Sequence, residues 1–145
     1  MVISGLPVGF GEPWFEGIEP ALARGLMAIP AARAVEFGRG VKAGLMRGSQ
    51  HNDKWGEEMS LSDGADGALG GMASGAPIHV RITFKPPSGI SKPQETFNQV
   101  TGMMEELAIK GRHDPVIGPR ARPVVEAVAR LVIADLAIQG GYIDG

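Results

Sequence analysis

The sequence predicts an α+β domain in which an antiparallel sheet packs on long helices. Residues 78–85 alternate strictly between apolar and polar side chains, as in a strand with one buried face. Residues 19–29 and 120–139 instead carry apolar side chains at helical spacing. The chain has 145 residues, which is enough for one domain with a core and short for two. We therefore treat residues 1–145 as a single domain.

The composition argues against several classes of protein. The charge is nearly balanced, with 14 Lys and Arg against 16 Asp and Glu, which argues against a nucleic-acid-binding surface. Cysteine is absent, so disulfides and thiolate metal sites are excluded, and we predict no metal site. No apolar run approaches the roughly 20 residues of a membrane span, and the first residues lack the pattern of a signal peptide. We expect a cytoplasmic protein without a membrane partner.

The first third of the chain predicts a helix flanked by strands. Pro20 suits the first turn of a helix that starts near Glu19, and Pro30 ends it. The other elements expected in this third are a strand over 2–8, a strand over 34–37 and, less clearly, a helix over 41–46.

Two polar or glycine-rich stretches follow. Residues 47–66 show almost no periodicity, and we predict a mobile loop there, of the length that often forms a lid. Residues 67–75 are rich in glycine, which allows the backbone to approach a ligand or a neighbouring helix closely. This pattern does not distinguish between those two partners.

The strand over 78–85 has a second face of potential cations that ends at Lys85. This face is either the water-facing side of an antiparallel sheet or the floor of a site for an anionic ligand. Residues 86–89 should then form a rigid turn. Residues 94–97 and 105–109 are further strand candidates.

The helix over 120–139 has an apolar arc that covers nearly half of its circumference. An arc that wide predicts burial against more than one partner, such as a sheet and a second helix. Asp135 falls inside the arc, so its carboxylate should be paired or lie at a seam. Gly140 and Gly141 end the helix.

A cluster of charged side chains precedes this helix, in residues 111–115. Arg112, His113 and Asp114 stand side by side, so that Arg112 could bind an anion while Asp114 handles a proton. The alternative is a solvated turn ending in Asp-Pro. From residue types alone the two interpretations are equally good.

The wider pattern resembles the C-terminal part of chorismate synthase. The resemblance covers residues 9–138 and contains six short motifs in the order of that family. They are Gly11-Glu12-Pro13, Leu26-Met27-Ala28-Ile29-Pro30-Ala31, Arg47-Gly48-Ser49, Leu69-Gly70-Gly71, Phe84-Lys85-Pro86 and Gly111-Arg112-His113-Asp114-Pro115. The polypeptide of that family is more than twice as long. Its N-terminal part, with a Gly-Ser-His motif, a second catalytic histidine and substrate-binding arginines, has no counterpart here.

The resemblance implies a fold, a reaction and an assembly. The fold would be one half of a β-α-β sandwich. The family eliminates phosphate from 5-enolpyruvylshikimate 3-phosphate to give chorismate, requires reduced FMN, and is a homotetramer. The chain would then be an enzyme segment that needs the missing part for turnover. The alternative is a non-catalytic fragment or assembly module that retains the fold.

The resemblance also implies roles for individual residues. Asp114 would be catalytic, and Arg112, His113 and Asp114 would border the substrate. The residues implied to contact FMN are Pro30, Ala31, Gly70, Lys85, Pro86, Pro87, Ser88, Gly89 and Arg112. Two positions depart from the family, because Asp66 stands where it usually has Gly and Pro87 replaces a common Thr. The added charge and the lost hydroxyl would weaken cofactor binding.

Overall fold

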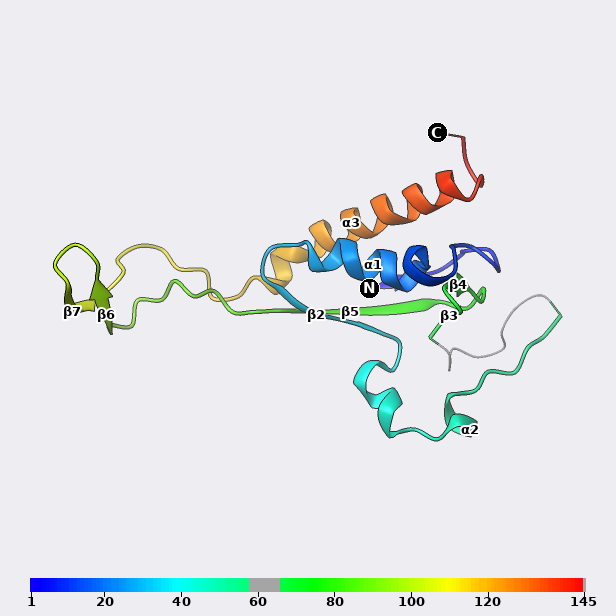
Figure 1. Cartoon of the computed structure of the whole chain (residues 1–145), viewed down its shortest axis with the longest axis horizontal. Helices are drawn as coiled ribbons and strands as arrows, with labels where there is room; N and C mark the ends of the chain where they lie inside the picture. The colour runs from blue at the N-terminus through cyan, green and yellow to red at the C-terminus, as the bar shows by residue number, and fades with distance from the viewer. Residues whose placement is uncertain (58–65, 145) are drawn as a thin grey trace.

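The computed structural model describes residues 1–57 and 66–144 and confirms the α+β class. Two helices, α1 (Ile18–Met27) and α3 (Gly118–Gln139), lie side by side over one face of a sheet (Figure 1). A long arm extends from one end of this body and returns to it. The arm leaves the body after the central strand and re-enters it at α3. The arm therefore connects the central strand of the sheet to the start of α3.

The sheet has three antiparallel strands in the order β1-β5-β2, with β5 in the middle. Their bounds are β1 (Val2–Ile3), β2 (Ala32–Phe37) and β5 (Ile78–Phe84). The alternation expected for β5 is confirmed, since Ile78 and Val80 are buried while His79 and Arg81 are exposed. β1 is shorter than the strand predicted over 2–8, because the chain turns at Pro7, whose carbonyl accepts a hydrogen bond from Phe10.

α1 supplies the centre of the core. Its fully buried residues are Ile18, Leu22 and Leu26, which recur at helical spacing on one face. Burying each such side chain stabilises the fold by about 1.5–3 kcal/mol. Gly25 lies where α1 crosses α3, and a Cβ on it would be 2.8 Å from Cγ2 of Val132. The missing side chain therefore lets the two helices pack closely.

α3 buries less of its surface than the sequence predicts. Its buried residues form one stripe, which consists of Ala121, Val125, Ala129, Leu136 and Ala137. Val124, Leu131 and Ile138 lie outside the stripe and are 46%, 71% and 47% exposed. α3 packs against α1 and shares the core with the sheet, as expected, while the outer part of its wide apolar arc is uncovered by the described residues. Asp135 is exposed and accepts a hydrogen bond from Gln139 at 2.7 Å, so it does not lie in a buried seam.

The stretch predicted as a mobile loop over 47–66 contains one short helix, α2 (Gly48–His51). Residues 58–65 of that prediction lie outside the described residues. Before α2 come two 3₁₀ turns, η1 (Trp14–Glu16) and η2 (Gly40–Leu45). η2 occupies most of the range predicted as helix over 41–46.

The glycine-rich stretch forms a small hairpin of β3 (Ala68–Leu69) and β4 (Met72–Ala73). Gly70 and Gly71 make its turn, both with positive φ. A Cβ on Gly71 would lie 2.4 Å from the Glu12 carbonyl oxygen, whereas none of the described atoms lies within 4 Å of one on Gly70. The hairpin therefore uses Gly71 for close packing.

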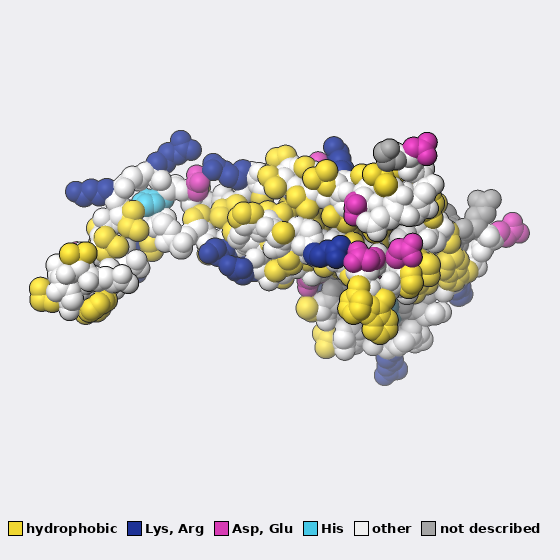
Figure 2. Space-filling model, turned by 45° about the horizontal axis from the view of Figure 1, so that its top comes forward, with side chains coloured by type: hydrophobic (Ala, Val, Ile, Leu, Met, Phe, Trp, Pro, Cys, Tyr) yellow, Lys and Arg dark blue, Asp and Glu magenta, His cyan; other side chains and the backbone are white. Residues whose placement is uncertain are grey.

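The arm ends in a second hairpin, β6 (Gln94–Asn98) and β7 (Met103–Leu107), paired with Phe97 opposite Met104. β7 begins and ends two residues earlier than predicted. Hydrophobic side chains gather at this tip (Figure 2), where Phe97, Met103 and Met104 are 57%, 62% and 61% exposed. In the described part of the chain, every helix is too short or too polar to cross a membrane.

Candidate functional site

The base of the arm joins two segments that are far apart in the sequence. The backbone N–H of Lys85 donates to the carbonyl of Ala31 at 2.9 Å, where β5 ends and β2 is about to begin. Ala31 has a φ of +69°, a conformation that costs a residue with a side chain about 1–2 kcal/mol. Such strain often occurs where the backbone is held for a ligand. Pro30, Ala31 and Lys85 therefore share one end of the sheet.

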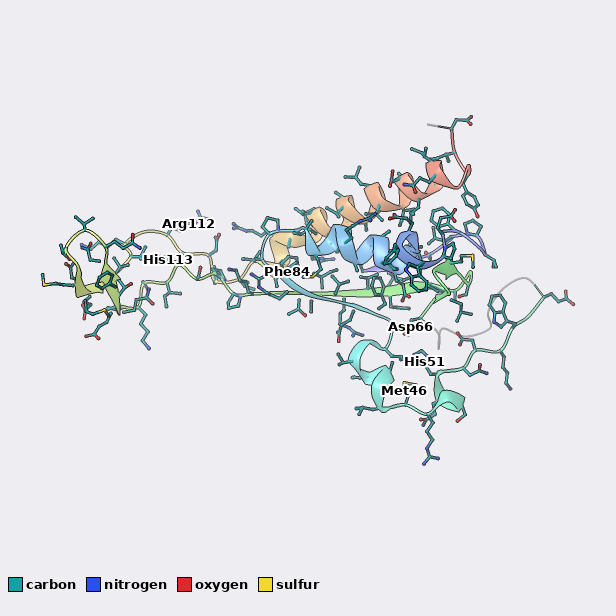
Figure 3. The ribbon with its side chains drawn as sticks, in the orientation of Figure 1. Met46, His51, Asp66, Phe84, Arg112 and His113 are labelled. Atoms are coloured by element: carbon teal, nitrogen blue, oxygen red, sulfur yellow. The ribbon has the colours of Figure 1, made fainter. Side chains whose placement is uncertain are left out.

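The arm consists of one segment that leads away from the body and one that returns to it. These two segments bring residues 86–89 near residues 111–115 (Figure 3). A Cβ on Gly89 would lie 3.7 Å from Nδ1 of His113. Nε2 of His113 lies 3.2 Å from the carbonyl oxygen of Ile109. A carbonyl can only accept, so Nε2 is the donor in this contact, and Nδ1 lies on the side of Gly89.

Two cations at this end of the molecule are free of acidic partners. Neither Lys85 nor Arg112 makes an ion pair with a described residue, and both are exposed. Both carry the donors that bind phosphate and carboxylate oxygens. Arg112 extends from the arm (Figure 3). Each of the two side chains is therefore available to an anionic ligand.

Asp114 is held by the first turn of α3. Nη1 of Arg120 donates to Oδ2 of Asp114 at 2.9 Å, with the two side chains 61% and 39% exposed. An ion pair this exposed contributes about 0–1 kcal/mol. The ion pair matters for position, because it fixes the returning segment of the arm to the start of α3.

Gly70 is separated from the other residues implied to contact FMN. A Cβ on Gly67 would lie 2.7 Å from the carbonyl oxygen of Pro77, which places the β3–β4 hairpin at the start of β5. Lys85 follows the end of β5, a strand of seven residues. At about 3.3 Å per residue, roughly 20 Å separate the two ends. The structure thus brings Ala31 to Lys85 and, farther along the arm, Gly89 to His113, and it leaves Gly70 apart from both contacts.

A second polar cluster, which sequence reasoning missed, lies around His51 and Asp66 (Figure 3), beside strand β3. Oδ1 of Asp66 accepts a hydrogen bond from the Arg39 backbone at 2.9 Å, and Oδ2 lies 3.5 Å from Nε2 of His51. Asp66 has a φ of +64°, which accounts for the usual Gly at this position. Burial, with a smaller contribution from Asp66, raises the pKa of the Glu19 carboxyl. The departure at position 66 was the available signal for this cluster.

Comparisons with known proteins assign the chain to a family. A family model described as chorismate synthase matches residues 1–138. The chain belongs to the chorismate synthase family.

Relatives in this family are similar over nearly the whole chain. The chorismate synthase of Methanosarcina mazei is 44% identical over 148 residues, which cover 99% of this chain and 40% of the relative. That of Aeropyrum pernix is 46% identical over 141 residues, or 94% of this chain and 37% of the relative. A solved structure titled as a crystal structure of chorismate synthase superposes with a TM-score of 0.73 at 27% identity, covering 96% of this chain and 36% of that one. The chain thus spans about 40% of its relatives' length.

Proposed function

We propose that this chain forms the flavin side of a chorismate synthase active site. In the complete enzyme, 5-enolpyruvylshikimate 3-phosphate would lose its phosphate and a proton, and a new carbon–carbon double bond would form to give chorismate. Family membership supports the reaction class. The relatives are much longer, so we assign turnover to the assembled protein and not to this chain by itself.

One observation carries this proposal. The arm places Gly89 against His113 and Lys85 against Ala31, so residues implied for one site come from three separate parts of the sequence. A solvated turn would not require contacts between segments that are so far apart in the sequence. It supports the functional interpretation of residues 111–115 over the structural one.

The residues at the arm base suit reduced FMN as the cofactor. The FMN phosphate is an anion, and Lys85 and Arg112 are exposed cations without acidic partners among the described residues. The hydroxyl of Ser88 and the backbone N–H of Gly89 would add hydrogen-bond donors. When bound, reduced FMN supplies electron density to the substrate as phosphate departs, and the overall change is redox neutral.

The substrate is also an anion, and residues 112–114 border its proposed place. Arg112 would bind its charged groups. The carboxylate of Asp114, held by Arg120, would assist removal of the proton. His113 would contribute Nδ1 as an acceptor. Pro30, Ala31, Pro86 and Pro87 would shape the wall by their backbones, and Gly70 would contact the cofactor only from another part of the assembly.

A second candidate function rests on the exposed apolar surface of α3 and of the arm tip. Patches of this kind mark interaction sites. The chain could then be an assembly module that keeps the fold without catalysing the reaction. We favour the enzyme segment, working in a homo-oligomer as the family does, because an assembly role does not account for the free cations at the arm base.

The test is complementation. The 145-residue chain is mixed anaerobically with an N-terminal portion prepared from the Methanosarcina mazei relative, reduced FMN and the enolpyruvyl substrate, and chorismate is measured. We expect turnover with both parts. Asp114→Asn should lower kcat by about 10²–10⁴-fold, the range for losing an acid–base group. Absence of turnover in a complex shown to have assembled would favour the assembly module.

Two variants test FMN binding in the same complex. Arg112→Ala should weaken FMN binding, measured by the flavin's fluorescence, because a charge-assisted contact is worth about 1.5–3 kcal/mol. Lys42→Ala removes an equal charge from the exposed η2 turn, at the far end of β2 from the arm. It should bind FMN as the parent does. Equal weakening by both substitutions would show a general charge effect and contradict the site.

A further inference from the structure

Residues 39–55 form a small lobe on the side of the sheet opposite to α1 and α3 (Figure 1). The lobe contains η2 and α2, and we call it the η2–α2 lobe. None of its residues is buried, and α2 makes few contacts with any other described helix or strand. A segment with so little buried surface opens locally at a low cost in free energy. Specific polar contacts must therefore hold the lobe in place.

Asp66, which precedes β3, contacts the lobe at two points. At the start of the lobe, Oδ1 of Asp66 accepts a hydrogen bond from the backbone N–H of Arg39 at 2.9 Å. In α2, Nε2 of His51 lies 3.5 Å from Oδ2 of Asp66 (Figure 3). The side chain of Asp66 is 12% exposed, so these contacts are largely shielded from water. One carboxylate thus joins the segment before β3 to two parts of the lobe.

The body provides a fitted space for this carboxylate at Gly38. A Cβ on Gly38 would overlap the side chain of Asp66, including Oδ1. The backbone N–H of Gly38 donates to the carbonyl of His79 at 2.7 Å, which fixes this space to the central strand β5. Asp66 therefore lies against the edge of the sheet, and the lobe is fastened to the sheet through it.

The contact between Asp66 and His51 is longer than an ordinary hydrogen bond. Such bonds between nitrogen and oxygen usually measure about 2.7–3.2 Å. Nε2 of His51 is nevertheless buried, and it has no hydrogen-bond partner among the described residues. Burying a donor without a partner is unfavourable, so a small movement of α2 toward Asp66 would stabilise the closed lobe.

Glu19 of α1 acts in the opposite direction. Together with His51 and Asp66, it lines a hollow of about 370 Å³ between α1, β3 and the lobe. Burial raises the pKa of the Glu19 carboxyl, and the nearby Asp66 raises it further, so the closed arrangement disfavours a negative charge on Glu19. The other charged or titratable side chains beside Asp66 are His79 and Arg81 of β5, which line a smaller hollow with it. Attraction and repulsion therefore meet at Asp66.

We propose that Asp66 is the latch of the η2–α2 lobe: its carboxylate holds the lobe against the body, and the lobe opens as a unit when the carboxylate is removed. The contacts with Arg39 and His51 close the latch, and the negative charge of Glu19 opposes closure. Closure also forms the hollow between Glu19 and α2. Glycine, which the family usually has at position 66, carries no carboxylate, so relatives with glycine there lack the latch. The inference does not rest on the proposed function.

The test is limited proteolysis of the whole chain by trypsin, without flavin or substrate, with the cleavage sites identified by mass spectrometry. The carbonyl of Arg47 accepts hydrogen bonds from the N–H groups of Gln50 and His51, so trypsin can cut after Arg47 only when α2 opens. Cleavage then follows the population of the open lobe. Asp66→Gly should be cut there at least fivefold faster than the parent. Cleavage after Lys110, in the arm, should not change.

Three further variants determine how the latch works. Glu19→Gln should slow cleavage after Arg47 at least twofold, because it removes the opposing charge. His51→Ala should speed this cleavage. The double variant with Asp66→Gly should be cut no faster than Asp66→Gly, because His51 acts through Asp66. Glu126→Gln is the matched control, since it removes an equal charge from α3 and should behave as the parent does.

Two results would overturn the proposal. One is cleavage after Arg47 at the parent's rate in both Asp66→Gly and His51→Ala. The other is a double variant in which the two effects multiply, because the two residues would then act independently. If Asp66→Gly is also cut after Arg24, in α1, the substitution weakens the whole fold, and His51→Ala decides. Faster cleavage after Arg47 with α1 intact then supports the latch, and an unchanged rate overturns it.

Discussion

Several single residues have backbone conformations that only their surroundings explain. Ala31 and Asp66 have positive φ although they carry side chains, and each lies at a polar cluster. Ala31 is held by its hydrogen bond with Lys85, and Asp66 by the hydrogen bond that its Oδ1 accepts from the backbone N–H of Arg39. Gly71 has the same requirement for a different reason, since its Cα packs against the start of α1.

The turn between β3 and β4 offers a matched pair of substitutions. Gly70→Ala should cost about 1 kcal/mol, because φ is +61° but the space around it is open. Gly71→Ala should cost at least about 2–3 kcal/mol, because φ is +96° and the new Cβ would overlap the Glu12 carbonyl. Urea unfolding measures both. Equal costs would show that the conformation matters and the close packing does not.

Glu19 makes stability depend on pH. Burial raises the pKa of its carboxyl above the ordinary 4.5, so the folded protein binds this proton more tightly than the unfolded chain. The contribution of Glu19 to stability is therefore best below pH 4.5 and declines as pH rises toward the raised value. Glu19→Gln should stabilise the fold by about 0.5–1 kcal/mol at pH 7.

The comparison of the two proteins at two pH values decides this. The difference in unfolding free energy between Glu19→Gln and the parent should shrink toward zero at pH 4 and below. A difference that is the same at pH 4 and pH 7 would mean that the carboxyl is not held in its protonated form by folding.

At the scale of elements, α3 exposes apolar side chains on the face that points away from the core. Val124, Leu131 and Ile138 are spaced by seven residues, so they lie almost in line along its outer face. A stripe of this kind is typical of a helix that packs against another helix. Because α1 covers only the opposite side, this stripe should drive association of the chain when it is alone.

Leu131→Lys tests the stripe. Leu131 is 71% exposed, so the change should alter unfolding free energy by no more than about 0.5 kcal/mol, while weakening self-association at least tenfold. Val41→Lys is the control, since Val41 is 81% exposed on η2 and lies off the stripe. Analytical ultracentrifugation measures the association. A parent chain that stays monomeric at all concentrations would contradict the prediction.

At the scale of the molecule, the proposed site has residues on one side only, and the facing residues would come from the rest of the complete enzyme. The residues at the arm base are exposed, and exposed charges are screened by water and salt. The substrate-binding arginines and histidines that the resemblance implies for the N-terminal part would supply the remaining contacts. Positioning of that kind can contribute about 7–11 kcal/mol to a reaction.

The chain alone should therefore form no measurable chorismate. Each absent acid–base group would cost about 10²–10⁴-fold, and Asp114 cannot replace two of them. Weak FMN binding should survive, because Lys85 and Arg112 are both present. Anaerobic turnover with reduced FMN, followed by the absorbance of chorismate, is the measurement. Chorismate produced by the 145-residue chain would require a base that the structure does not identify.

The elements that the sequence predicted correctly are those with a strong local pattern. Strict alternation over 78–85 and helical spacing in α1 and α3 depend on which side chains are apolar, and that is written in the chain. β1 and β7 were less accurate, because turns and hairpin register are decided by pairing with distant residues. The grouping of Arg112 with Asp114 was available from adjacency in the sequence.

By itself, the sequence determined the α+β class, the main helices and the central strand, and, through its motifs, the family. Only the tertiary structure decided which of the implied residues meet. It placed Ala31 beside Lys85 and Gly89 beside His113, and it left Gly70 at the other end of β5. The physical reason is that local patterns depend on neighbours a few residues away. Contacts across a strand and along the arm depend instead on how distant segments pack.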